Sequence, residues 1–500
     1  MASQQRQHPP KPDLVAAMNR AFAMGLFSAV LWLASCSAKD DGPINVSIIG
    51  PSTRMPDPVL GQSTAASRLL LGATAQGLVS FDASDQVQPA LAERWIVTDD
   101  GLSYIFRIRE ATWSDKQPVT SVDVVNSLKR SLATNSRHPF KGLFTPVTAI
   151  IPMTGQVVEI RLKTPEPNFL QLLAQPEMAI LRSGGGTGPY AIHSRRDGII
   201  RLRPRPDPEA SEAELEKRAG DQNDDVRVRA ETATMAIARF LEGDARFVTG
   251  GTYADLPLAR AADVDAGRFQ RDPAYGLFGL AVTASSKTLD SADLRLALTL
   301  AIDREALVRS FGVADWPSAI SILPAALDSG AAPAALAALQ VPIGERRERA
   351  KALIPASVRG RTIKVALPSA LGGRLLFAHL EADWQRIGIK AVRVMPSQPA
   401  DLVLIDDVAP VSSAVWYLDR LACRDGLRCN EEAQQLLNEA LAELDPAIRK
   451  DKIAQADAAL VAASDYIPLA LPMRWSLVGA NLTGWRASAF AVHALDQLRK

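Results

Sequence analysis

The stretch RTIKVALPSALGGRLLFAHLEADWQRIGIKAVRVM, residues 361–395, decides the fold class of this chain. Its two ends, RTIKVALP and IKAVRVM, are short and rich in β-branched residues, as β-strands are. The segment between them has the length and composition of a helix, and Gly388 is a typical helix end. Such a strand–helix–strand unit has a right-handed crossover and places its two strands parallel in one sheet. The sequence therefore predicts an α/β protein.

Other segments extend this alternation of strands and helices along the chain. Residues 203–225 are charged and proline-rich, which predicts a loop or a solvated face. Strands are expected at 44–49, at 93–110 as a hairpin that turns at Asp100-Gly101, and at 156–165. Helices are expected at 120–132 with Thr120 as cap, at 293–312 with Asp303 as an internal cap, and from Asp445-Pro446 onward.

The overall composition narrows the possible functions. The chain has 500 residues, of which 47% are apolar and 22% are charged, and its net charge is +1. Because the charges balance and no basic stripe is interleaved with aromatic residues, no nucleic-acid partner is expected. The five histidines lie far apart in the sequence, so no local metal-ligand spacing is present and no cofactor is expected.

One long apolar run, residues 21–34, follows Arg20 near the N-terminus. A helix needs about 20 apolar residues to span a bilayer, so this run is too short for a transmembrane anchor. A cation, a short apolar stretch and small residues at its end are typical of a signal peptide. We therefore expect residues 1–35 to form a signal peptide, with Met1 or Met18 as its start.

The apolar run ends in Leu33-Ala34-Ser35-Cys36, which resembles the lipobox of bacterial lipoproteins. The resemblance implies that Cys36 becomes a lipid-modified N-terminus; an ordinary signal peptide with a chance cysteine is the alternative. Two acyl chains would anchor the protein durably, since one chain binds a membrane only marginally. Residues 36–43 would then form a tether, and the protein would lie in the periplasm or cell envelope, held by its lipid.

Apart from Cys36 the chain contains two cysteines, Cys423 and Cys429, in the segment CRDGLRC. An even pair that closes a small loop around Asp425-Gly426 suits a disulfide in an oxidising compartment. The alternative is a pair of buried thiols.

Several segments resemble, in the same order, the extracytoplasmic solute-binding proteins of ABC importers in the peptide/nickel-binding family, family 5. The likeness extends over nearly all of the chain that follows the predicted signal peptide. The segments are GLVSFDASDQVQPALAERWIVTDDGLSYIFRIREATWSDKQPVTSVDVVNSLKR (77–130), GTGPY (186–190), LRLALTLAIDREAL (294–307) and YIPLALP (466–472).

The resemblance implies a two-lobed periplasmic-binding-protein fold of class II, with an extra subdomain in the first lobe. It also implies two strands that cross between the lobes, near 275–282 and 466–472. The expected boundaries are 44–75 and 181–282 for the first lobe with its hinge strand, 76–180 for the extra subdomain, 283–466 for the second lobe, and 467–500 for the segment that returns to the first lobe.

The sequence departs from the family pattern at three places. Lys116 stands where the family commonly has glycine, and the charged stretch at 204–225 replaces an Asn-x-x-Tyr-Trp motif. Peptide binders of the family usually carry a Trp-x-x-Asp-x-x-Asp-Pro-like segment, whose aspartate pairs with the amino group of the ligand. The corresponding region, 401–423, has no such tryptophan and no Asp-Pro, so that aspartate cannot be assigned to one residue here.

Three pairs of residues are candidates for contacts with a solute, and each has a structural alternative. Asp406 and Asp407 follow an apolar strand, at the kind of sheet edge where ligands bind, and could pair with an ammonium group or form a solvated turn. Trp416 and Tyr417 could form flat walls of a cleft or pack in the core. Arg474 and Trp475 could meet a carboxylate and an apolar group.

The resemblance implies a monomeric lipoprotein that binds a small peptide or similar organic solute between hinged lobes. It would deliver this solute to the permease subunits of an ABC importer, and no enzyme activity is expected. One alternative is a binding or sensor lipoprotein for a non-peptide ligand, such as a nickel complex, a sugar or an opine. Another is a cell-envelope hydrolase, although the chain has no Gly-x-Ser-x-Gly nucleophile motif.

Overall fold

The computed structural model describes residues 42–51, 57–61, 64–182, 185–206, 224–325, 327, 332–354, 358 and 361–499. The predicted signal peptide, Cys36 and nearly all of the predicted tether lie outside these residues, as does most of the predicted loop at 203–225. The described strands form sheets of seven, five, four and two strands, with helices between them along the chain. The predicted α/β class is therefore confirmed.

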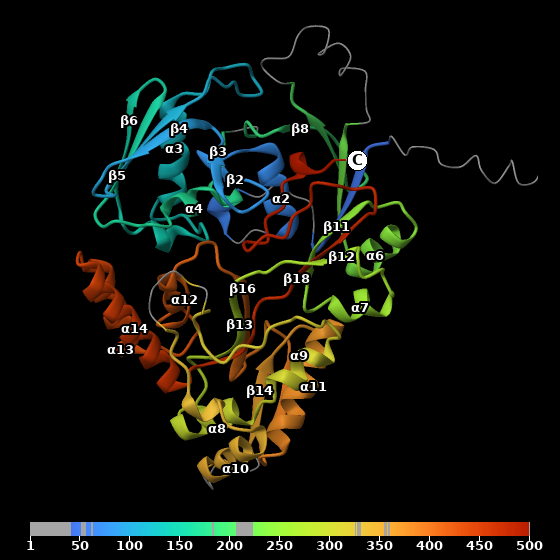
Figure 1. Ribbon diagram of the computed structural model, residues 1–500, viewed down its shortest axis with the longest axis vertical. Helices are drawn as coiled ribbons and strands as arrows, with labels where there is room; N and C mark the ends of the chain where they lie inside the picture. Colours follow the sequence, from blue (N-terminus) through green and yellow to red (C-terminus); the bar gives the residue numbers. More distant parts are fainter. Residues whose placement is uncertain are drawn as a thin grey trace, which may run out of the picture. The chain divides into compact units, whose positions relative to one another are not determined.

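The seven-stranded sheet has the strand order β12-β18-β11-β1-β10-β9-β8. Its strands β8, β11, β12 and β18 are labelled in Figure 1. The predicted strand at 44–49 is β1, in the middle of this sheet and parallel to both β10 and β11. Its side chains alternate between the two faces, so Val46 and Ile48 pack with α2 while Ile49 packs with α6. The elements are β1 (Ile44–Ile49), α2 (Ala65–Thr74), β8 (Tyr190–Arg196), β9 (Ile199–Pro204), β10 (Val226–Glu231), α6 (Ala233–Leu241), β11 (Phe247–Thr252), α7 (Leu256–Ala261), β12 (Phe269–Arg271) and β18 (Arg474–Val478).

The five-stranded sheet has the order β15-β14-β16-β13-β17. The strand–helix–strand unit predicted at 361–395 is confirmed, because β14 and β15 pair in parallel and are joined by α11. Gly388 ends the helical region with a φ of +83°, a left-handed conformation that glycine adopts without a steric penalty. The elements are β13 (Gly276–Val282), β14 (Thr362–Ala366), α11 (Leu371–Gln385), β15 (Lys390–Val394), β16 (Leu402–Val408) and β17 (Tyr466–Ala470).

The chain changes from one sheet to the other twice. It leaves the seven-stranded sheet after β12 and returns through the connection between β17 and β18. The two connections contact each other, since the Asp272 N–H donates to the Arg474 carbonyl oxygen at 3.0 Å. The first change of sheet falls at residues 272–275, just before β13, which pairs with β16 along its whole length.

The four-stranded sheet, in the order β4-β5-β7-β6, and the two-stranded sheet β2-β3 lie together in residues 79–162. The predicted hairpin is formed by β4 and β5, and Gly101 turns it with a φ of +68°. The predicted helix at 120–132 is α3, which begins with a capping box between Thr120 and Asp123. The elements are β2 (Val79–Phe81), β3 (Val87–Pro89), β4 (Ala92–Val97), β5 (Ser103–Ile108), α3 (Ser121–Leu132), β6 (Val147–Thr154), β7 (Val157–Leu162) and α4 (Phe169–Leu173).

Six further helices accompany the five-stranded sheet. Asp303 caps α9 and Asp445 caps α14, as the sequence predicted. None of the helices in the described part of the chain is both long and apolar enough to cross a bilayer. The helices are α8 (Ala292–Ala301), α9 (Arg304–Ser310), α10 (Ile343–Leu353), α12 (Ala414–Leu421), α13 (Glu431–Ala442) and α14 (Pro446–Ala463).

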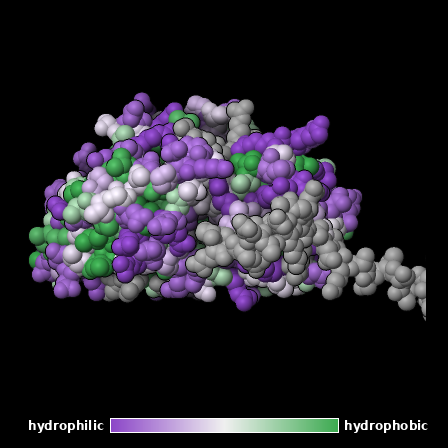
Figure 2. Space-filling view, turned by 90° about the horizontal axis from the view of Figure 1, so that it is seen from above, coloured by the Kyte–Doolittle hydropathy of each residue, from purple (hydrophilic) through white to green (hydrophobic). Residues whose placement is uncertain are grey.

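Large apolar side chains are mostly buried between these layers. The face shown in Figure 2 is largely hydrophilic, with apolar residues gathered mainly toward one side. Exposed large apolar side chains such as Ile96, in β4, and Leu444, between α13 and α14, come from separate parts of the chain. Isolated exposed apolar groups of this kind are normal on a protein surface.

The loop between Cys423 and Cys429 lies against the ends of β13 and β17. The two cysteines are at bonding distance, with Cα atoms 4.2 Å apart, as the expected disulfide requires. The loop is also held by main-chain hydrogen bonds, because Ala284 N–H donates to Gly426 O at 3.0 Å and Arg428 N–H donates to Val282 O at 2.8 Å.

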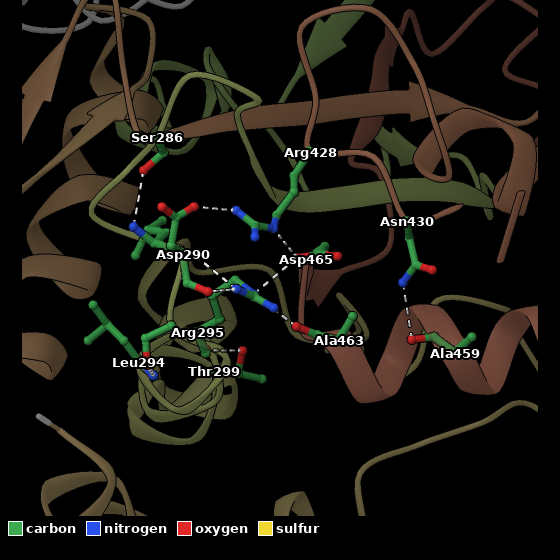
Figure 3. Close-up of polar contacts among 12 residues, drawn as sticks. Ser286, Asp290, Leu294, Arg295, Thr299, Arg428, Asn430, Ala459, Ala463 and Asp465 are labelled. Atoms are coloured by element: carbon green, nitrogen blue, oxygen red, sulfur yellow. Dashed lines mark hydrogen bonds and ion pairs between the residues drawn. The ribbon is translucent and has the colours of Figure 1, made fainter. Parts of the chain in front are cut away.

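Arg428 joins this loop to a buried ion-pair network (Figure 3). Its Nη1 lies 2.8 Å from Asp290 Oδ1, and its Nε lies 3.5 Å from Asp465 Oδ1. Arg295 of α8 contacts the same Asp465 oxygen at 3.0 Å and donates to the main-chain oxygen of Ala463. The Arg295 and Asp465 side chains are only 7% and 9% exposed, so the buried Arg295 depends on Asp465 for its carboxylate partner.

We expect Asp465→Asn to lower the free energy of unfolding by about 3 kcal/mol, because it leaves the buried Arg295 without a carboxylate. Urea denaturation followed by circular dichroism measures this change. Asp451→Asn, at an exposed position of α14, is the matched control and should alter the free energy of unfolding by less than about 0.5 kcal/mol. Equal stability of Asp465→Asn and the wild-type protein would contradict the role given to this network.

Candidate functional site

A cleft of about 1420 Å³ lies between elements of both large sheets. Its lining comes from α2 and β11, from the neighbourhood of β2 and β3, from the turn at 186–190 and from the end of β16. Pockets for small molecules usually measure about 300–1,000 Å³. This cleft is therefore large enough for a solute of peptide size.

Arg474 and Asp406, predicted separately as solute contacts, bind each other at the floor of the cleft. Arg474 begins β18, and its Nη1 lies 2.8 Å from Asp406 Oδ1 on β16. Its Nη2 also donates to the Asp406 carbonyl oxygen at 2.9 Å. Burial raises the pKa of Asp406, and the neighbouring Arg474 guanidinium opposes that rise. The pair connects the seven-stranded sheet to the five-stranded sheet.

Asp407 also has an arginine partner within the chain. Its Oδ2 lies 2.8 Å from Nε of Arg420 on α12. Asp406 and Asp407 both line the cleft, but they lie inside β16 and not in a turn after it. Because each carboxylate already faces a guanidinium, neither offers an uncompensated negative charge to a solute ammonium group.

The three predicted aromatic residues have different surroundings. Trp475 lines the floor, is 1% exposed, and donates from Nε1 to Thr252 O at 2.9 Å. Trp416 is half-buried and lines the cleft. Tyr417 is fully buried among α12, α13 and α14 and does not line the cleft, since adjacent helix residues point about 100° apart. The core-packing alternative therefore describes Tyr417.

Trp475 is held by a close approach of the backbone. It stacks on Phe269 with ring centroids 5.6 Å apart. On its other side, a Cβ added at Gly251 would lie 2.2 Å from the indole ring. Only glycine leaves room for the indole against β11, so the position of Trp475 in the floor is fixed by its neighbours.

A second group of polar residues in the cleft wall was missed by the sequence reasoning. Glu177 is buried, and its Oε1 lies 2.9 Å from Nε of Arg68 on α2. Arg68 also donates from Nη2 to Gln175 Oε1 at 3.1 Å. Behind them, His138 contacts the Glu177 carbonyl oxygen through Nε2 at 3.0 Å. No local motif marks these residues, because they come from three separate segments.

The pair of His493 and Asp272 completes the polar lining. His493 Nε2 lies 3.1 Å from Asp272 Oδ2, and Asp272 Oδ1 accepts the Ser488 N–H at 3.0 Å. The two partners are 221 residues apart in sequence, so only the fold brings them together. Within the described residues, no group of three or more His, Cys, Asp or Glu side chains is arranged to hold a metal ion.

His138 gives the cleft wall a pH-dependent contribution to stability. Its Nδ1 accepts the Phe140 N–H at 3.2 Å, so Nε2 carries the proton that is donated to Glu177 O. Burial lowers the pKa of His138 below its usual 6.5. The folded protein therefore keeps this imidazole neutral at a pH where the unfolded chain binds a proton.

We expect the stability that depends on neutral His138 to be present above about pH 6.5 and to be lost as the pH falls, with a slope of up to about 1.4 kcal/mol per pH unit. Urea denaturation between pH 5 and 7.5 measures this slope, and His138→Gln should flatten it. His193→Gln, at an exposed position of β8, should leave it unchanged. Identical pH slopes in the wild-type protein and His138→Gln would contradict the assignment.

Comparison with known proteins agrees with this architecture. Residues 86–392, more than half of the chain, match the family described as bacterial extracellular solute-binding proteins, family 5 Middle. The probable deoxycholate-binding periplasmic protein YgiS of Escherichia coli (strain K12) is 33% identical over 140 residues, which cover 24% of this chain and 26% of that protein. The glutathione-binding protein GsiB of Salmonella typhi is 24% identical over 304 residues, which cover 57% of this chain and 56% of that protein. Both matches cover less than two thirds of the relative's length.

A likeness to solved structures covers nearly the whole fold. The crystal structure of Haemophilus influenzae OppA in complex with RPPGFSPFR superposes with a TM-score of 0.78 at 15% sequence identity, and the match covers 91% of this chain and 98% of that chain. At this identity the likeness shows the fold alone. It confirms the expectation of a periplasmic-binding-protein fold.

Proposed function

Because this chain belongs to the bacterial extracellular solute-binding proteins of family 5, we propose that its cleft captures a small peptide or a similar organic solute and delivers it to the permease of an ABC importer. The observation that carries this proposal is the cleft of about 1420 Å³ between elements of the two large sheets. GsiB is named for glutathione and OppA was solved with a nine-residue peptide, RPPGFSPFR. Both names support a peptide-like solute for this chain.

The proposed mechanism is closure of two halves around the solute. Each half is built on one large sheet, and the halves are joined where the chain changes sheet, at 272–275 and between β17 and β18. A solute that contacts both halves only in the closed form shifts the population toward that form. Shifting the ratio of closed to open protein from 1:99 to 99:1 takes about 5.5 kcal/mol of binding free energy. A solute that binds with a micromolar dissociation constant supplies about 8 kcal/mol, which is enough.

Polar contacts along one edge of the cleft support such closure. They connect the segment that includes α4 to the five-stranded half. Asn168 donates to Ser412 O at 3.0 Å, and Gln175 Nε2 donates to Pro410 O at 2.6 Å. Arg449 of α14 contacts Glu166 at 3.2 Å. Hydrogen bonds of this kind contribute only about 1 kcal/mol net each, so water can replace them when the halves separate.

The remaining features fit a receptor outside the cytoplasm that performs no covalent chemistry. We propose that Cys36 carries the lipid anchor, that the segment after it is a tether, and that Cys423 and Cys429 form a disulfide. The protein would act as a monomer and transfer its solute to the importer without modifying it. The hydrolase alternative has no support from the cleft, whose described polar groups are mainly ion pairs.

The proposed function predicts that protein purified without denaturation carries a solute that mass spectrometry can identify after release. The change Gly72→Trp, on the face of α2 that lines the cleft, should abolish retention because the indole fills the binding space. A Cβ at Gly72 meets no atom within 4 Å, so the backbone tolerates a side chain there. The Gly72→Trp variant should also lose the binding of di- to pentapeptides, as measured by calorimetry.

Gly344→Trp is the matched control. It also lies in a helix, α10, with no atom within 4 Å of an added Cβ, but it does not line the cleft. This variant should retain the solute and bind peptides like the wild-type protein. Absence of any retained solute, together with unchanged melting temperature in the presence of every peptide tried, would refute a peptide receptor.

A further inference from the structure

Most charges in the cleft are compensated within the chain. The lining contains six Lys or Arg residues and six Asp or Glu residues. Three acidic side chains form ion pairs with arginines, in the combinations Arg68–Glu177, Arg420–Asp407 and Arg474–Asp406, and a fourth, Asp272, contacts the ring of His493. Glu110, Asp496, Arg109 and Lys116 are exposed at the surface. Arg205 remains as a half-buried cation of the lining for which the described residues provide no carboxylate.

Arg205 is held in place from two sides by the turn at 186–190. Its own N–H donates to Pro189 O at 2.7 Å, and its Nη2 donates to Gly186 O at 2.9 Å. Two hydrogen bonds hold this turn against the C-terminal end of α2. Gly188 N–H donates to Thr74 O at 3.0 Å, and Gln76 Nε2 donates to Thr187 O at 2.9 Å. The guanidinium is therefore positioned before any solute arrives.

This environment is unfavourable for a cation without a partner. The Nε of Arg205 is buried and has no hydrogen-bond acceptor among the described residues. Burial lowers the pKa of Arg205, which means that its surroundings disfavour the charged form. Buried polar groups are nearly always hydrogen-bonded, so a half-buried guanidinium with one main-chain acceptor and no carboxylate among the described residues can accommodate a further acceptor from a solute. A carboxylate is the acceptor that matches guanidinium geometry best.

We propose that Arg205 forms an anion-binding subsite, which makes the cleft selective for solutes that present a carboxylate at this position. This inference rests on the proposed function, since it specifies the class of solute that the same cleft accepts. The compensated aspartates of β16 in the same lining favour the same class, because they offer no free negative charge to a basic solute. A charge-assisted hydrogen bond to Arg205 should improve the affinity for an acidic solute about 10- to 100-fold.

The test compares matched probes that differ only in a carboxylate. Calorimetry measures the dissociation constants of Ala-Glu-Ala and Ala-Gln-Ala, and thermal unfolding measures stabilisation by millimolar glutarate or its diamide. Each probe is applied to the wild-type protein, to Arg205→Gln and to Arg195→Gln, an exposed arginine of β8 that does not line the cleft. Circular dichroism establishes that the variants are folded.

The wild-type protein and Arg195→Gln should bind the glutamate peptide at least about tenfold more tightly than the glutamine peptide, and Arg205→Gln should bind both alike. Equal binding of both peptides by the wild-type protein would overturn the subsite and leave the proposed function intact. A preference for the glutamate peptide that persists in Arg205→Gln would have the same consequence. If no peptide binds but glutarate stabilises the wild-type protein and not Arg205→Gln, the subsite stands and the peptide receptor fails. If none of the probes binds or stabilises the wild-type protein, both the subsite and the proposed function are overturned.

Discussion

The ion pair between Arg474 and Asp406 is the contact on which the cleft depends. Arg474 is the first residue of β18 and Asp406 lies in β16, so one pair of side chains fastens the two large sheets together where the chain returns from one to the other. Both side chains are only 17% exposed, and removing one partner of such a pair typically costs about 3–5 kcal/mol. Closure around a solute requires such a fixed contact, about which the two halves can move.

The same pair also shapes the electrostatics of the cleft. Arg474 compensates the charge of Asp406, and Arg420 compensates that of Asp407. These two aspartates therefore offer no free negative charge to an ammonium group of a solute. Elsewhere in the lining, Arg205 has no carboxylate partner among the described residues. The departure from the family's usual aspartate segment, seen in the sequence at 401–423, has its structural counterpart here.

Local sequence signals predicted the elements well, because they depend on near neighbours. The hairpin at Asp100-Gly101, the capping box at Thr120 and the parallel unit that contains α11 were all predicted from short segments and are confirmed. The site was predicted only in part. Asp406 and Arg474, predicted as solute contacts, both line the cleft, but their mutual pairing spans 68 residues and is a property of the fold. Glu177, His138 and Arg205 carry no local motif, so their roles depend on neighbours that the sequence does not reveal.

The central claim is that two halves close around a solute about the contacts between Asp272, Arg474 and Asp406. Spin labels at Met235 and Leu444, which are 46% and 67% exposed and lie in α6 and between α13 and α14, report the separation of the halves. Pulsed electron resonance would measure this distance in a Cys36→Ser background, before and after addition of the solute that copurifies with the protein. The account predicts a broad distribution without solute that narrows and shifts to shorter distances with it. An identical distribution in both states would contradict it.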